Sequence, residues 1–147
     1  MKLVPVVLLL IATAQFGKAD ELKDTCYRLQ LSKWTPAMSL GGDEVYITPP
    51  SAFALTSHVL RTIDGKPEFE ISPALGVSPS VHRRASWTSD GKKINLVWTN
   101  GFSGLSMELE RSKEGLRGIA HTFWDFDRTV QSSRVFAQAV PCGAASN

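Results

Sequence analysis

The chain contains two cysteines, and they lie at the two ends of the part whose sequence is typical of a folded domain. Cys26 precedes the first alternating segment and Cys142 follows the last. In an exported protein such a pair forms a disulfide by default, and two cysteines allow only one connectivity. The bond would join the first strand to the last, so the simplest fold is a chain that closes on itself. Two unpaired thiols and a metal site remain as alternatives.

The first residues predict a cleaved export signal. Lys2 precedes an apolar run, 3–14, that has the length of a signal-peptide core and is too short to span a bilayer as a helix. Small residues at Ala12 and Ala14, and again at Gly17 and Ala19, offer two cleavage positions, and the polar Asp20 favours cleavage after Ala19. We therefore expect residues 1–19 to be removed, residues 20–147 to form one domain, and the mature protein to be secreted or periplasmic.

The charge balance excludes several classes of partner. The chain has 16 basic and 14 acidic residues, and two of the basic ones, Lys2 and Lys18, belong to the predicted signal. A mature chain so close to neutral lacks the basic field that attracts nucleic acid or anionic membranes. We expect no nucleic-acid partner, no stable membrane insertion, no cofactor and a monomeric protein.

Short alternating segments separated by turn residues predict an all-β fold. Asp90-Gly91 and Asn100-Gly101 are strong hairpin signals between such segments. Gly118, inside a predicted strand, indicates a bend or a close backbone approach. An even number of strands in a meander places the start of the first beside the end of the last. The sequence thus predicts a single antiparallel meander closing into a roughly eight-stranded barrel, with strands at about 27–31, 51–63, 68–72, 85–87, 93–98, 105–110, 116–125 and 133–140.

This combination of export signal, strand count, meander and one disulfide resembles the lipocalin-like, or calycin, group of secreted barrels. The resemblance is architectural and implies a carrier of a small apolar molecule. The Gly-x-Trp sequence of that group does not occur here, since Trp34 follows Leu31-Ser32-Lys33. No residue's role is therefore carried over from the group.

Aromatic residues are the first candidates for a binding site. The chain has four tryptophans, and they either fill the barrel or line a pocket in it. An eight-stranded barrel has an interior just wide enough for either arrangement. Trp98 shares a predicted face with Ile94 and Leu96, so it is expected to point into the barrel. Trp34 lies in a loop, where it would be at the mouth of the barrel or would close the barrel end as a plug. The candidate ligand-binding aromatics are Trp34, Trp87, Trp98 and Trp124.

Charged residues supply two further candidate sites. Arg83 and Arg84 form a local basic pair that would bind a carboxylate or phosphate at the rim, or is simply a solvated loop end. His121, Asp125 and Asp127 fall at alternate positions and would share one side of a strand, where they could hold a divalent cation. The alternative is that the two aspartates are solvated residues entering a turn.

Three classes of function follow. The first is a binding protein for a small apolar or amphipathic ligand. The second is a non-catalytic protein-interaction module, for example an exported inhibitor or envelope accessory protein. The third, a metal-assisted enzyme using His121, is less favoured, because segment 101–104 lacks the Gly-x-Ser-x-Gly spacing of a nucleophilic serine and no ordered triad is visible.

Overall fold

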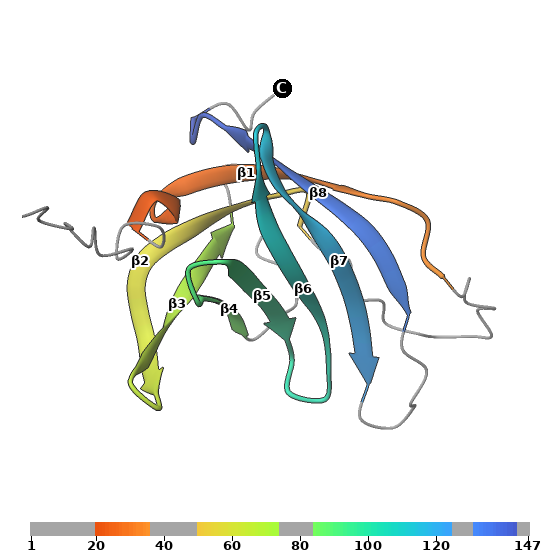
Figure 1. Cartoon of the computed structure of the whole chain (residues 1–147). Helices are drawn as coiled ribbons and strands as arrows, with labels where there is room; N and C mark the ends of the chain where they lie inside the picture. The colour runs from red at the N-terminus through yellow and green to blue at the C-terminus, as the bar shows by residue number, and fades with distance from the viewer. Residues whose placement is uncertain (1–19, 36–49, 74–83, 125–130, 144–147) are drawn as a thin grey trace, which may run out of the picture.

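The computed structural model describes residues 20–35, 50–73, 84–124 and 131–143, which form a closed β-barrel (Figure 1). The predicted signal, 1–19, lies outside the described residues. Eight antiparallel strands follow in sequence order and the last pairs with the first, so the predicted fold class is confirmed. The elements are η1 (Asp20–Leu22), β1 (Thr25–Leu31), β2 (Ala52–Ile63), β3 (Lys66–Pro73), β4 (Arg84–Ser89), β5 (Lys93–Thr99), β6 (Ser103–Ser112), β7 (Gly115–Trp124) and β8 (Ser132–Val140).

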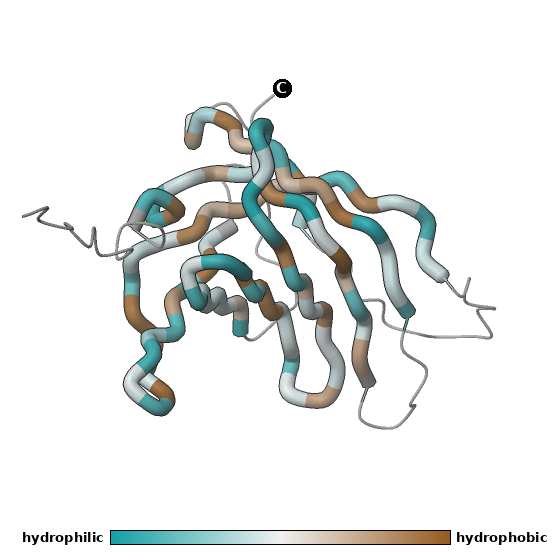
Figure 2. The backbone as a smooth tube through the Cα atoms, in the orientation of Figure 1, coloured by the Kyte–Doolittle hydropathy of each residue, from teal (hydrophilic) through white to brown (hydrophobic). Residues whose placement is uncertain are grey.

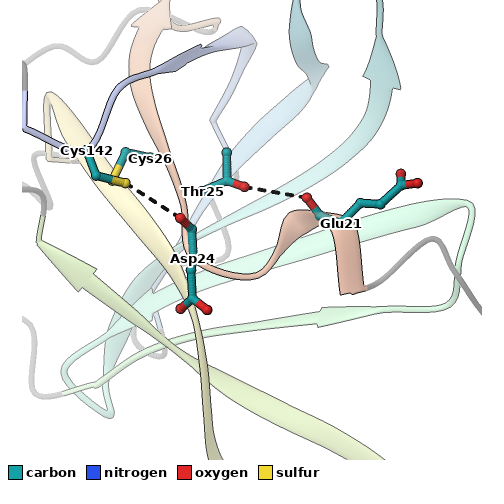
Figure 3. The surroundings of a disulfide bond; sticks show 5 residues. All are labelled: Glu21, Asp24, Thr25, Cys26 and Cys142. Atoms are coloured by element: carbon teal, nitrogen blue, oxygen red, sulfur yellow. Dashed lines mark hydrogen bonds between the residues drawn. A yellow bond between two sulfur atoms is a disulfide. The ribbon is translucent and has the colours of Figure 1, made fainter.

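The predicted disulfide joins the two ends of the barrel sheet. Cys26 in β1 is bonded to Cys142 just after β8, with their Cα atoms 5.1 Å apart. Six residue pairs connect β1 and β8, beginning with Cys26 and Val140. Figure 3 shows the bond beside Asp24, whose carbonyl oxygen lies 3.6 Å from the Cys142 sulfur. A bond of this kind indicates an oxidising compartment outside the cytoplasm.

The antiparallel meander gives the barrel two unlike rims. The hairpin rim carries the short turns 64–65, 90–92 and 113–114, together with the disulfide. The opposite end, which we call the loop rim, receives the connections between β1 and β2, β3 and β4, β5 and β6, and β7 and β8. Three of these four connections are longer than any turn at the hairpin rim.

Alternation, strictest along β5, places apolar side chains inside the barrel. Along β5, buried and half-buried residues alternate through all seven positions, with Ile94, Leu96 and Trp98 facing inward as the sequence predicts. Leu105 and Met107 of β6 lie opposite Trp98 and Leu96 and are equally buried. Figure 2 shows the same alternation of apolar and polar positions along the tube of the later strands. The core therefore sits inside the barrel.

Polar turn residues fix the register of the hairpins. Asp64 and Gly65 both have positive φ angles, 49° and 75°, as a two-residue hairpin turn of the Asp-Gly type requires. The Asp90 carboxylate accepts bonds from the backbone N–H groups of Lys92 and Lys93, at 2.9 and 2.7 Å. Asn100 holds the next turn in the same way. These contacts explain why the predicted turns are the actual ones.

Gly118 marks a close approach of two strands, as predicted. It pairs with Leu109 across the β6–β7 hairpin. A Cβ atom at this position would lie 1.9 Å from the carbonyl oxygen of Glu108, well inside van der Waals contact. Only glycine allows the two backbones to approach this closely.

The far half of β2 departs from the alternation of its near half. Phe53 and Leu55 are fully buried, whereas Val59 is 46% exposed. The register of β2 against β3 shifts on both sides of Val59. The pairing of β2 with β1 also ends at Leu55. Beyond that point β2 and β3 form a two-stranded ribbon that does not pair with β1.

Candidate functional site

The barrel interior is filled by aromatic rings in contact with one another. Phe53 stacks on Tyr27 and meets Trp98 edge to face, with ring centroids 5.7 and 5.5 Å apart. Phe69 and Trp87, directly opposite each other on β3 and β4, stack at 4.7 Å. Such contacts add specific attraction to the burial of apolar area.

Of the four candidate tryptophans, Trp87 and Trp98 lie in this core, at 1% and 2% exposure. The indole N–H of Trp87 donates to the carbonyl oxygen of Thr56, 3.1 Å away, where the β2 register is irregular. Trp34 is half-buried and packs against the core. Trp124 ends β7, and its side chain lies outside the described part of the structure.

Among the residues that the structure describes, those facing the centre of the barrel are fully buried. Water or a ligand-sized void inside a barrel would leave the surrounding side chains partly exposed. Instead, inward residues from several strands have 0% exposure, so packing between them resembles that of an ordinary protein core. These residues are Phe53, Leu55, Leu96, Leu105, Leu109, Ala120 and Ala137.

The second candidate, Arg84, lies on the outer face in an ion network that sequence analysis missed. Its Nη2 donates to Oε2 of Glu68 at 2.6 Å, and Nε of Arg61 donates to the same oxygen. The Glu68 side chain is only 10% exposed. Arg83 lies outside the described residues. The network joins β2, β3 and β4 on the outside of the barrel, where β3 and β4 share only two residue pairs.

The surroundings of Glu68 favour its ionised form. Burial acts to raise the pKa of this carboxyl group, but a hydrogen bond from Ser86 and the guanidinium groups of Arg61 and Arg84 outweigh burial. The pKa of Glu68 is therefore lowered from its usual value. A carboxylate that is more acidic in the folded state stabilises the fold above the unfolded-state pKa. That stabilisation is lost as the pH falls through the folded-state pKa.

Replacing this carboxylate by an amide, Glu68→Gln, is expected to reduce the free energy of unfolding by about 1.5–3 kcal/mol at pH 7, because the two arginines lose their charged acceptor. Urea unfolding at pH 7 and at pH 3 measures the effect. The difference between the wild type and the variant should shrink at pH 3, where the carboxyl group of the unfolded chain is protonated and the contribution of its lowered folded-state pKa is diminished.

Glu70 offers a matched control on the same strand. It pairs with His58 at 3.0 Å, but its side chain is 45% exposed. Because exposed pairs contribute about 0–1 kcal/mol, Glu70→Gln should be nearly neutral. Equal losses from the two variants would mean that the Glu68 network has no special role.

The third candidate, the metal site, is only partly within the described residues. His121 lies on the outer face of β7, opposite Ser106 and Ser132. Asp125 and Asp127 lie outside the described residues. Within the described ranges, no three His, Cys, Asp or Glu residues come together as metal ligands.

His121 does line a different feature, a shallow hollow of about 510 Å³ on the outside of β5, β6 and β7. The alternation of these strands places the lining side chains on the outer face, on the other side of the sheet from Leu96 and Met107. We call this feature the outer hollow. The outward side chains that line it include Asn95, Val97, Ser106, Glu108, Ile119 and His121, and the charged Glu110 and Arg117 line it as well.

Within the described residues, no helix is long and apolar enough to cross a membrane. Comparisons of the chain with protein-family models, with curated proteins and with solved structures found no match. The class that the structure defines is thus the small, closed, antiparallel β-barrel, and its eight-stranded meander is consistent with a lipocalin-like architecture.

Proposed function

We propose that this protein is an exported, non-catalytic binding module that recognises its partners through the outside of the barrel and the loop rim. The observation that carries the proposal is the filled interior. Aromatic rings and aliphatic side chains that are 0–2% exposed occupy the place where a lipocalin-like barrel would carry its cargo.

A small apolar ligand inside the barrel is the competing proposal. The barrel is compatible with ligand binding in general, because eight strands enclose enough room for one small molecule when the side chains allow it. Here a ligand at the centre would have to displace Trp98 together with Leu105 and Phe53, which contact one another or lie on neighbouring positions. Displacing close-packed side chains costs free energy that an unoccupied pocket does not require.

Two features support a role at the surface. The disulfide favours a secreted or periplasmic location. The longest connections of the chain, 32–51, 74–83 and 125–131, all join strand ends that lie at the loop rim. Loops held on a rigid scaffold commonly carry recognition.

The experiment is a titration of the oxidised mature protein with a retinoid, a fatty acid and a tetrapyrrole, followed by tryptophan fluorescence. Because Trp87 and Trp98 lie in the core, a ligand that enters the barrel must change their emission. We expect no saturable change with any of the three. A saturable shift that a second apolar ligand competes away would overturn the proposal in favour of an apolar-ligand carrier.

A further inference from the structure

We propose that the outer hollow binds a neutral, polyhydroxylated ligand, such as a saccharide unit. This inference rests on the proposed function in one respect, because both place the binding surface on the outside of the barrel. With about 510 Å³, the hollow falls within the range of about 300–1,000 Å³ that is usual for small-molecule sites.

The strand register brings the lining residues into two short rows across the sheet. In the first row Asn95 of β5 lies opposite Glu108 of β6, which in turn lies opposite Ile119 of β7. In the second row Val97, Ser106 and His121 follow in the same order. Ser106, in the middle of the second row, has a smaller side chain than its neighbours Val97 and His121, so the surface is recessed there.

Most of the charged side chains around the hollow are held in ion pairs. Lys93 binds Glu108 at 2.6 Å, and this hydrogen bond raises the pKa of the lysine. Arg117 lies opposite Glu110 on the neighbouring strand and forms an ion pair with Glu114 at 3.4 Å. The carboxylates of Glu108, Glu110 and Glu114 outnumber the two cations, so the hollow disfavours an anionic ligand. A neutral ligand avoids the cost of removing a charge from water.

The polar groups of the hollow suit hydroxyl groups, which both donate and accept hydrogen bonds. The Asn95 amide, the Ser106 hydroxyl and the His121 ring supply donors and acceptors. Within the described part of the chain, these three side chains make no hydrogen bond to one another or to other residues. Ile119, 48% exposed, and the half-buried Val97 add an apolar surface for the C–H groups of a sugar ring.

An extended polypeptide is a poorer occupant. Peptides that bind to a sheet through main-chain hydrogen bonds require an unpaired strand edge. The three strands that form the hollow are each paired on both sides, since β5 also pairs with β4 and β7 with β8. Recognition at this place therefore depends on side chains alone, which favours a compact ligand.

The test is an NMR titration of the oxidised mature protein with a panel of neutral mono- and disaccharides. We expect saturable amide shifts at Asn95, Ser106, Ile119 and His121 for at least one sugar, with a Kd on the order of 1 mM or below. Ser106→Phe fills the hollow and should weaken binding at least about tenfold. Ser57→Phe, at an exposed position on β2, is the matched control and should leave binding unchanged.

Asn95→Ala removes an amide without adding bulk, and it keeps the test decisive if Ser106→Phe does not fold. Shifts that persist unchanged in both hollow variants would overturn the proposal, as would a complete lack of saturable shifts across the panel. Shifts at the hollow with a short peptide but no sugar would assign the site to a polypeptide instead. Trp98 faces the core, on the other side of the sheet from the hollow, and its emission is the readout for ligand entry into the barrel. Failure of the saccharide proposal is therefore distinguishable from failure of the proposed function.

Discussion

Replacing Cys26 and Cys142 together by serine is expected to lower the free energy of unfolding by about 4.7 kcal/mol, the chain-entropy estimate for opening a loop of about 100 residues. The two cysteines are 116 positions apart, so the bond restrains almost the entire domain in the unfolded state. The loss is large compared with a total stability of about 5–15 kcal/mol for a typical domain. Urea unfolding of the variant and of the oxidised wild type, followed by circular dichroism, measures it.

The six residue pairs between β1 and β8 remain in the variant, so β structure should persist at low temperature while the melting temperature falls. Wild-type protein that has been reduced and alkylated provides a control, because it lacks the bond without a change in sequence. An unchanged melting temperature in both forms would mean that the disulfide does not hold the barrel ends together in solution.

Much of the fold can be read from the sequence because a barrel repeats one local rule. Alternation along β5 and β6 identifies the inward residues, and Asp90-Gly91 and Asn100-Gly101 end the strands where turns are needed. The even strand count then brings Cys26 and Cys142 to the same rim. Each of these inferences depends on residues that are near in sequence or on the number of strands being even.

The features that escaped prediction depend on register between distant segments. Glu68 and Arg84 are 16 positions apart, and nothing local indicates that they share an ion network with Arg61. The irregular pairing on both sides of Val59 is equally invisible, because the sequence of β2 continues to look like a regular strand.

The outer hollow is hidden for the same reason. Its rows cross three strands, so Asn95, Ser106 and His121 become neighbours only once both pairings are known. The alternation does show that all three face away from the core. That signal marks them as outer residues without showing that they lie together.

The second large expected effect is the loss of stability when a side chain of the packed interior is truncated. Trp98→Ala is expected to reduce the free energy of unfolding by about 3–5 kcal/mol, since truncating a buried aromatic side chain removes its contacts and leaves a cavity. Trp98 meets the ring of Phe53 and lies opposite Leu105, so its loss opens the centre of the barrel. Thermal or urea unfolding of the variant measures the loss of stability.

Ile63→Ala is the matched control, because Ile63 is 47% exposed at the end of β2 and its truncation should change stability by no more than about 0.5 kcal/mol. The cavity in Trp98→Ala also allows the interior to be probed directly. Engineered apolar cavities bind small apolar molecules such as benzene. Benzene should therefore raise the melting temperature of Trp98→Ala and leave the wild type unchanged. Stabilisation of the wild type to the same extent would mean that the barrel already contains an open apolar space, and the carrier function would then be favoured over recognition at the surface.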